Sequence, residues 1–417
     1  MKFRPFRAIR PRDGEAAARV AALPYDVMTA AEARAMVADK PDSFLHVDKA
    51  EIDLDPAIDP YSDQVYQQAA ANLADLQRRG RLIRDPQPTY YLYQLTMDGR
   101  TQTGLVGCAS VDDYLDGAIK KHELTRADKE EDRVRHVDTL NANTGPIFLA
   151  QRPDPDLDTL VQAWLANHPP VYDFMADSGV RHTVFRVGDP ATVERITALF
   201  QQVPALYIAD GHHRCASAVR VAGLRRDAHP GYGGDEEFNF FLAVVFPSNQ
   251  LHIMDYNRVV ADLNGLSVPG FLAAARERFD VTVPDDAQAP FRPTAPHQFG
   301  LYVDGTWSAL TAKPGWIDEA DPVGRLDAIV LQDGLLGPVL GIGDPRTDKR
   351  IDFVGGIRGL AELSRRVDTA GDGAAFALTP VRMDDLLAVA DAGRIMPPKS
   401  TWFEPKLLSG LFIHELA

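Results

Sequence analysis

The sequence predicts an α/β protein with mixed sheets, because helical and strand-like patterns follow one another along most of the chain. Alanine-rich stretches near the start, such as residues 14–23, carry their apolar side chains at helical spacing. Residues 89–111 alternate apolar and polar side chains around Asp98-Gly99, which is typical of a two-stranded hairpin. After residue 261, helical stretches again alternate with short strands.

The first 88 residues are predicted to be helices joined by loops. Helical spacing is found in residues 14–23, 30–39 and 61–79. Between the first two of these stretches, Thr29 can cap the following helix through its hydroxyl group. Asp26 stands shortly before Thr29 in the sequence, in the stretch LPYDV. We interpret Asp26 as a turn residue, with a functional role as the alternative.

The central segment, residues 89–260, continues after the hairpin with a short strand-like stretch and a helix. The pattern Thr125-x-x-Asp128 is typical of a helix start, and the helix is expected over residues 126–141. Two apolar strands are predicted around Ser248-Asn249. One face of the helix combines basic and imidazole side chains, those of Lys129, Arg133 and His136.

The remaining residues, 261–417, are predicted to form a C-terminal α/β region with a hairpin at Asp304-Gly305. Helical spacing is found in residues 269–279, 359–367 and 383–393. The chain is therefore expected to consist of three segments, 1–88, 89–260 and 261–417.

The charge balance argues against one class of partner. The chain has 44 Lys and Arg against 59 Asp and Glu, which gives a formal net charge of −15. Proteins bind duplex nucleic acid through clustered cations that neutralise phosphates, so we expect no nucleic-acid partner. A local pocket can still be positive on an acidic protein, so small anions remain candidate ligands.

Cysteine content and hydropathy indicate the compartment. Cys108 and Cys215 are the only cysteines, too few for a disulfide framework, which suits a reducing compartment. No stretch approaches the ~20 apolar residues of a membrane span, and residues 1–10 lack the apolar core of a signal peptide. We therefore expect a cytoplasmic protein with no membrane partner; the oligomeric state stays unassigned.

The stretch ALYIADGHHRCASAVR, residues 205–220, contains the strongest candidate for a binding site. Asp210 to Arg214 spans a turn between a buried strand and a helix. Such a turn exposes backbone N–H groups at the positive end of the helix, and both features favour a bound anion. Gly211 lets the backbone approach a ligand closely, and Arg214 offers a fork-shaped donor to phosphate oxygens.

Two alternatives stay open for this turn. A zinc site is less favoured, because His212 and His213 are adjacent and would point in different directions, and no Cys or His partner has ligand spacing. The other alternative is a purely structural polar turn. Cys215 is interpreted as a small buried residue rather than a nucleophile. The metal is left unassigned.

Two further polar clusters contain candidate residues. Lys121, His122 and Glu123 stand just before the predicted helix, close to its basic face. The following KEEDR run, taken alone, is interpreted as a solvated helix with ion pairs. Near the C-terminus, Lys399-Ser400-Thr401 resembles the end of a phosphate-binding loop, although no glycine-rich segment precedes it. A proline-fixed turn is the alternative there, although Lys399 and Lys406 can reach a shared anion from another segment.

The chain resembles an uncharacterised prokaryotic family, domain-of-unknown-function family ten-fifteen, through the motifs LPYDV, KKHELTRADKEEDR, YIADGHHRCASA and MPPKSTWFEPKLLSGL. The resemblance covers nearly the whole chain and departs at Cys215, where the family usually has an aromatic residue. The Asp-Gly-His-His-Arg turn is similar in turn to the nucleotide-binding turn of the ParB/sulfiredoxin-like superfamily. This second resemblance implies a ParB/sulfiredoxin-like core with additional α/β segments.

Three activities of that superfamily can be compared with these residues. Sulfiredoxins have a catalytic cysteine where this chain has His212, and ParB proteins bind DNA, which a net charge of −15 disfavours. Free-serine kinases bind a nucleotide at this turn and transfer phosphate to a small hydroxyl group. The resemblance therefore implies a kinase of free serine or a related hydroxy amino acid, with ATP or ADP and Mg²⁺ as cofactors. The alternatives are a phosphatase or other hydrolase of a phosphorylated metabolite, and a non-catalytic nucleotide-sensing module.

In such a kinase, Glu123 or Asp210 is expected to be the base, the other acid a Mg²⁺ ligand, and His122 a further catalytic residue. The nucleotide, or another small phosphorylated ligand, is expected to contact Gly211, His212, His213, Arg214, Lys129, Arg133, Lys399, Ser400 and Thr401. Glu123 and Arg214 are therefore expected to line one pocket.

Overall fold

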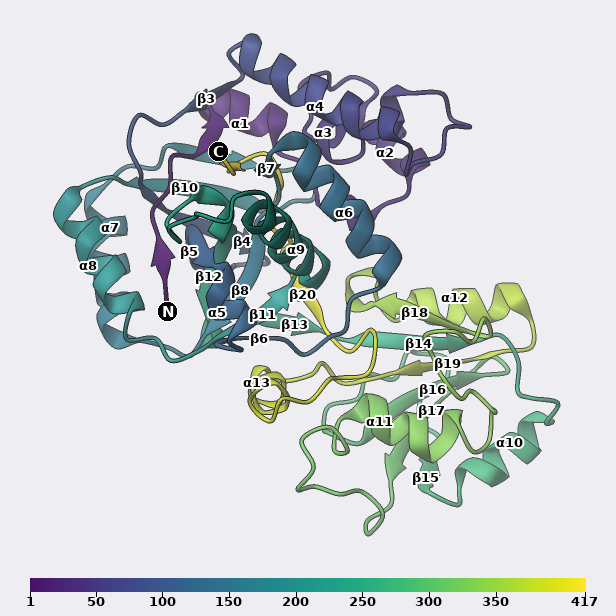
Figure 1. Ribbon diagram of the computed structural model, residues 1–417. Coiled ribbons are helices and arrows are strands. Elements are labelled where there is room, and N and C mark those ends of the chain that lie inside the picture. The colour runs from purple at the N-terminus through teal and green to yellow at the C-terminus, as the bar shows by residue number, and fades with distance from the viewer. The chain divides into compact units, whose positions relative to one another are not determined.

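The structure is a computed structural model that describes residues 1–417. Contacts divide the chain into two compact units. Unit 1 consists of Met1–Leu251 and Pro405–Ala417, and unit 2 consists of His252–Glu404. Each unit contains helices and β-sheet (Figure 1). The predicted α/β class with mixed sheets is confirmed.

This division differs from the three predicted segments. The helices of residues 1–88 share a hydrophobic core with Leu140, Ala142 and Ile413, so they belong to unit 1. The chain also returns to unit 1 after unit 2, where β21 (His414–Glu415) pairs with β7 (Ala142–Asn143). These contacts join residues far apart in the sequence, so local composition could not predict them.

Unit 1 is built on a nine-stranded mixed sheet. Its strands are β1 (Phe3–Arg4), β4 (Tyr90–Met97), β5 (Arg100–Ser110), β6 (Ile119–Lys120), β8 (Ile147–Gln151), β9 (Tyr172–Met175), β10 (Arg181–Val187), β11 (Leu206–Asp210) and β12 (Phe240–Pro247). Eight of them follow the order β6-β11-β8-β12-β5-β4-β10-β9, and β1 pairs with β5. The β6–β11 and β8–β12 pairs are parallel, and the other pairs are antiparallel. The short strands β2 (Ile9–Pro11) and β3 (Leu82–Arg84) pair separately.

The predicted hairpin is present as β4 and β5, joined at Asp98-Gly99, where both residues have positive φ. The helices of unit 1 are α1 (Gly14–Val20), α2 (Ala30–Val37), α3 (Leu45–Asp48), α4 (Asp63–Arg78), α5 (Val111–Leu115), α6 (Ala127–Leu140), α7 (Pro155–Asn167), α8 (Pro190–Phe200) and α9 (His212–Ala228). Thr29 caps α2 as predicted. Thr125 does not cap α6, because its hydroxyl group donates to Glu130 at 2.7 Å and Arg126 occupies the cap position.

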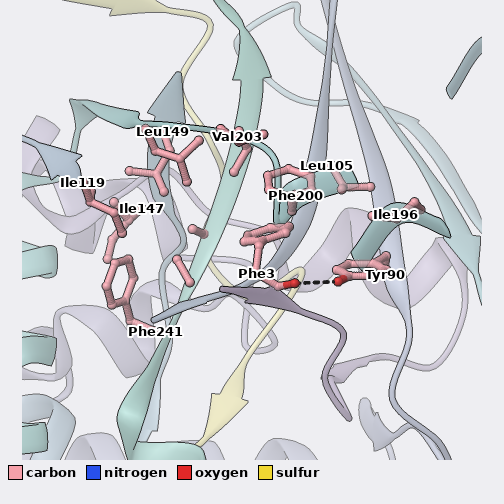
Figure 2. Packing of buried hydrophobic residues seen from close by; sticks show 14 of the residues in the cluster. Phe3, Tyr90, Leu105, Ile119, Ile147, Leu149, Ile196, Phe200, Val203 and Phe241 are labelled. Carbon is pink, nitrogen blue, oxygen red and sulfur yellow. Dashed lines mark hydrogen bonds between the residues drawn. The ribbon is translucent and has the colours of Figure 1, made fainter. Parts of the chain in front are cut away.

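The core of unit 1 lies where the sheet packs against helices. Phe3 stacks on Phe200 of α8 with ring centroids 4.4 Å apart, and the Tyr90 hydroxyl donates to the Phe3 carbonyl at 2.8 Å (Figure 2). Cys215 of α9 is fully buried in the same cluster, as predicted. Helix α9 also packs against α6. This packing fixes the N-terminal end of α9 at the edge of the sheet that carries β6 and β11.

Unit 2 contains a six-stranded antiparallel sheet. Its strands, in spatial order, are β15 (Phe279–Thr282), β17 (Thr306–Ala312), β16 (Gln298–Val303), β19 (Ala374–Ala377), β14 (Tyr256–Val260) and β18 (Ile351–Gly355). Alternate residues face two separate cores: Leu301 and Val303 belong to one, and Tyr302 belongs to the other. Helices α10 (Val268–Ala275) and α11 (Asp327–Leu331) contribute to the first core, and α12 (Ala361–Ala370) to the second. Helix α13 (Met383–Asp391) follows β19.

The two ends of unit 2 lie side by side. Strand β13 (His252–Met254) pairs antiparallel with β20 (Trp402–Glu404), so that His252 is opposite Glu404. Unit 2 is therefore an insertion in unit 1 that leaves and returns through one two-stranded ribbon. Over the whole chain, no helix has both the length and the apolar character that crossing a bilayer requires.

Acid is expected to destabilise unit 1 through its buried histidines. Burial lowers the pKa of His182 to about 4, and the pKa values of His122 and His136 shift in the same direction. Such a histidine binds a proton on unfolding at a pH between its two pKa values, so stability falls as the pH drops from about 6.5 towards 4. At pH 5 the loss is on the order of 2 kcal/mol for one such histidine. Urea unfolding at pH 7 and pH 5 measures this loss.

A pair of variants assigns the effect to burial. His182→Gln is expected to reduce the difference between the two pH values. His229→Gln, at an exposed histidine, is the matched control and should leave the difference unchanged. Equal differences in both variants would show that His182 does not contribute.

Candidate functional site

The candidate site lies where β6 and β11 end together. These two strands are parallel, with Lys120 opposite Tyr207. The segments that follow parallel strands leave from the same edge of a sheet. His122 and Glu123 follow β6, and the turn that begins α9 follows β11, so the two predicted motifs meet in the folded chain.

The turn between β11 and α9 has the predicted strand-to-helix form. Gly211 occupies the N-cap position with φ of 90°, in the left-handed region that favours glycine, and no side chain caps the helix. A Cβ at Gly211 would lie 3.1 Å from the guanidinium carbon of Arg214. Glycine therefore lets the Arg214 guanidinium approach the backbone of the turn. Because no side chain caps the helix, the first N–H groups of α9 have no side-chain partner.

Asp210 is held between two cations. Its Oδ2 lies 3.5 Å from the Lys406 ammonium and 3.6 Å from the Arg214 guanidinium. Burial alone would raise the pKa of Asp210, but the charges of Lys406 and Arg214 outweigh burial and lower this pKa well below its usual range. Asp210 therefore stays charged at neutral pH and is a weak proton acceptor.

His122, Glu123 and His212 form a compact cluster beside this turn. The rings of His122 and His212 meet edge to face, with centroids 4.6 Å apart. One potential ligand atom from each of the three residues lies within 4.8 Å of the others. Both histidines are buried, and burial lowers the pKa of His122 to about 4 and that of His212 well below its usual value. Both imidazoles are therefore neutral at pH 7.

This donor set does not fit the Mg²⁺ ion that the family resemblance implies. Mg²⁺ prefers oxygen ligands in octahedral geometry, whereas two of the three donors here are imidazole nitrogens. The other carboxylate of the site, Asp210, is already engaged by Lys406 and Arg214. The predicted pairing of one acid as base and the other as Mg²⁺ ligand therefore has no support in the geometry.

Arg214 also lines a small cavity on another side of the turn. Its Nη1 donates to the Pro146 carbonyl at 2.6 Å, and its side chain is 11 % exposed. Arg133 lies across the cavity, paired with Asp132 at 2.8 Å and placed over the Tyr25 ring at 4.0 Å. The cavity has a volume of about 20 Å³, which has room for about one water molecule.

The expected common pocket of Glu123 and Arg214 is not found in this cavity, which Glu123 does not line. Residues two apart on a helix project about 200° apart, so His212 and Arg214 face different sides of α9. Glu123 lies with His212, and Arg214 lies with Arg133. Asp210 joins the two sides through its contact with Arg214.

Comparison with known proteins places the chain in a family. Residues 3–329 match the family described as protein of unknown function, DUF1015. The chain belongs to this family. No curated protein matches the chain significantly.

Solved structures with low overall similarity to this DUF1015 protein include a conserved hypothetical protein from Pyrococcus furiosus. It has 15% sequence identity and a TM-score of 0.32, over 73% of this chain and 93% of that chain. A mutant of free serine kinase in complex with AMP has 14% identity and a TM-score of 0.33, over 72% and 87%. C-terminally truncated SbnI from Staphylococcus aureus has 12% identity and a TM-score of 0.36, over 73% and 85%. The family assignment therefore rests on the match over residues 3–329.

Two residues of this DUF1015 protein that were predicted to contact the nucleotide make other contacts. Lys129 donates to the Tyr61 hydroxyl at 2.8 Å and does not line the cavity beside Arg214. His213 accepts a hydrogen bond from the Arg126 backbone N–H at 3.0 Å through Nε2. Arg133, by contrast, lies close to Arg214. The binding roles of Lys129 and His213 stay predictions.

The third predicted cluster belongs to unit 2. Ser400 donates to the Pro397 carbonyl at 2.8 Å, and the Lys399 ammonium lies 5.7 Å from the centre of the Tyr256 ring. Pro397 helps to line a cavity of about 290 Å³ in this unit. The buried residue Arg258 also lines this cavity. The binding roles of Lys399, Ser400 and Thr401 stay predictions.

The cavity beside Arg214 is lined by residues that the sequence did not assign to the site. Asp48 lies on the cavity wall and accepts a hydrogen bond from the Thr144 hydroxyl at 2.9 Å. No local pattern marks Asp48 or Thr144. Tyr25 stands in the LPYDV stretch, and its neighbour Asp26 helps to raise the pKa of Arg214, against the lowering effect of burial. The LPYDV stretch was therefore the available signal.

Proposed function

We propose that this protein is a small-molecule phosphotransferase, with a nucleotide as phosphate donor and a small hydroxylated amino acid as acceptor. The observation that carries the proposal is the position of Glu123 beside the first turn of α9. A carboxylate that can accept a proton and an anion-binding helix start then lie at one edge of the sheet.

The start of α9 supplies the features that a phosphate group requires. Its first N–H groups point out of the helix without a capping side chain, at the positive end of the helix dipole. Arg214 and Lys406 place two cations around Asp210 at the same turn. Asp210 orients these cations, and the phosphate oxygens would be bound by the backbone and by the guanidinium group.

Glu123 is the proton acceptor in this proposal. The acceptor hydroxyl oxygen forms a bond to the transferred phosphorus atom, while the bond from phosphorus to the bridging oxygen of the nucleotide breaks. The nucleotide leaves with that oxygen, and Glu123 takes the hydroxyl proton. Asp210 suits this role less well, because its pKa is lowered despite its burial.

The test uses the full chain with ATP or ADP labelled at the terminal phosphate, a panel of divalent metal ions, and free serine. Serine is the acceptor that the family resemblance implies. We expect labelled phosphoserine to form with serine and no labelled product with alanine, which lacks the hydroxyl group. Nucleotide binding without transfer to serine, threonine or homoserine would contradict the proposal and favour a sensing module. Phosphate release from phosphoserine without net transfer would favour a hydrolase.

A further inference from the structure

Two imidazole rings are buried in unit 1 with unpartnered nitrogen atoms. Both ring nitrogens of His122, and Nε2 of His212, form no hydrogen bond of normal geometry, although the Ile208 backbone interacts with the His122 ring. Burying a polar atom without a partner costs free energy, and nearly all such atoms in folded proteins are paired. Unpartnered atoms also occur elsewhere in the chain, for example Trp307 Nε1, but here two such rings are in contact with each other. A ligand between or beside these rings would supply the missing partner.

A carboxylate stands with these rings. One ligand atom each of His122, Glu123 and His212 lies within 4.8 Å of the other two, which is the only group of this kind in the chain. Neutral imidazoles and a carboxylate are the common ligands of zinc and related transition metals. A phosphate or other anion explains the rings less well, because a neutral imidazole offers only one N–H donor.

We propose that His122, Glu123 and His212 bind one transition-metal ion, Zn²⁺ or an ion of similar ligand preference, instead of Mg²⁺. Zinc bonds to nitrogen and oxygen are about 2.0–2.2 Å long, so neighbouring ligand atoms of a tetrahedral site lie about 3.3 Å apart. The ion would therefore draw the three side chains slightly together. Both rings would then have partners for the nitrogens that bind it.

Three protein ligands leave one position of a tetrahedral ion open. Sites of this type hold a water molecule or a substrate oxygen there and act as Lewis acids, in contrast to closed structural sites with four protein ligands. Only the identity of that substrate oxygen rests on the proposed phosphotransfer. The binding of the ion itself depends on the three side chains alone.

The test measures metal binding by the full chain without nucleotide or serine. After removal of metal with a chelator, the protein is dialysed against Zn²⁺ or Co²⁺, and the bound metal is measured by mass spectrometry. We expect one ion per chain, which excess Mg²⁺ does not displace. The Co²⁺ form should show the visible absorption of a tetrahedral or five-coordinate nitrogen and oxygen site.

Variants locate the ion. His122→Ala and His212→Ala are each expected to lose the bound ion. His213→Ala is the matched control, because His213 is the next residue on α9 and its Nε2 instead accepts a hydrogen bond from the Arg126 backbone. This control should keep the ion. Far-UV circular dichroism checks that each variant is folded.

The outcomes separate this inference from the proposed function. Absence of stoichiometric Zn²⁺ or Co²⁺ in the unaltered chain overturns the metal site even if a variant unfolds, and so does full retention by folded His212→Ala. Phosphate transfer with Mg²⁺ alone, in a chain that binds no stoichiometric Zn²⁺ or Co²⁺, would overturn the metal site and support the phosphotransferase. Stoichiometric Zn²⁺ without any transfer would support the metal site and contradict the phosphotransferase.

Discussion

Replacing Glu123 with glutamine is expected to lower the rate of phosphate transfer by roughly 10²–10⁴-fold, the range for loss of a general base. Glutamine keeps the size of the side chain and its hydrogen-bonding capacity, but its amide cannot accept the hydroxyl proton. Nucleotide affinity should be maintained, because the start of α9 is unchanged. Single-turnover transfer assays and nucleotide titrations of the same preparation measure both quantities.

A second glutamate provides the matched control. Glu131 is exposed on α6 and pairs with Arg220 at 2.8 Å. Glu131→Gln removes the same charge from the same unit and should keep full activity. Full transfer in Glu123→Gln would show that Glu123 is not the base and would leave Asp210 as the candidate.

The Glu123 variant also separates two roles of this residue. If Glu123 acts only as a proton acceptor, Glu123→Gln should leave the amount of bound metal unchanged. As a metal ligand, its replacement should weaken Zn²⁺ binding together with activity, since the neutral amide is a poorer ligand than a carboxylate. Metal content measured beside the transfer rate distinguishes these results.

Replacing Arg214 with alanine is expected to weaken nucleotide binding by about 1.5–3 kcal/mol, the range for charge-assisted hydrogen bonds. This corresponds to a decrease in affinity of roughly 10- to 150-fold. The variant removes a guanidinium group that lies beside both Asp210 and the backbone of the turn. Calorimetric titration with ADP measures the change.

The control for this variant lies on the same helix. Arg220 is exposed on α9 and pairs with Glu130 and Glu131, so Arg220→Ala should leave nucleotide affinity unchanged. Arg214 also donates to the Pro146 carbonyl, so unfolding must be monitored by circular dichroism. A variant of Arg214 that loses its fold would favour the structural polar turn instead. A folded variant with unchanged affinity would remove Arg214 from the binding site.

Local chemistry explains why the turn before α9 was predictable. An apolar strand, a glycine and a helix-forming stretch follow one another directly, and the structure places Gly211 at the predicted boundary. The hairpin at Asp98-Gly99 was predictable for the same reason. In each case the residues that determine the conformation are neighbours in the sequence.

The composition of the site depends on pairing between distant strands. His122 meets His212 because β6 and β11 run parallel in one register, and Lys406 reaches Asp210 only because the chain returns to unit 1. Neither of these contacts produces a periodic pattern of residues in the sequence. The sequence also could not predict which partner each side chain of α6 contacts. Lys129 and Arg133 are one turn apart on this helix, yet Lys129 donates to the Tyr61 hydroxyl while Arg133 lies close to Arg214.

The order in which a ribosome makes the chain gives the returning segment a particular importance. Residues 405–417 are synthesised only after the whole of unit 2, although they belong to unit 1. During synthesis, the nascent unit 1 therefore lacks the partner strand of β7 and the ammonium group beside Asp210. The turn before α9 receives its last cation late in translation, so a nascent chain that stops within unit 2 lacks the Lys406 ammonium at the site that we propose for phosphate.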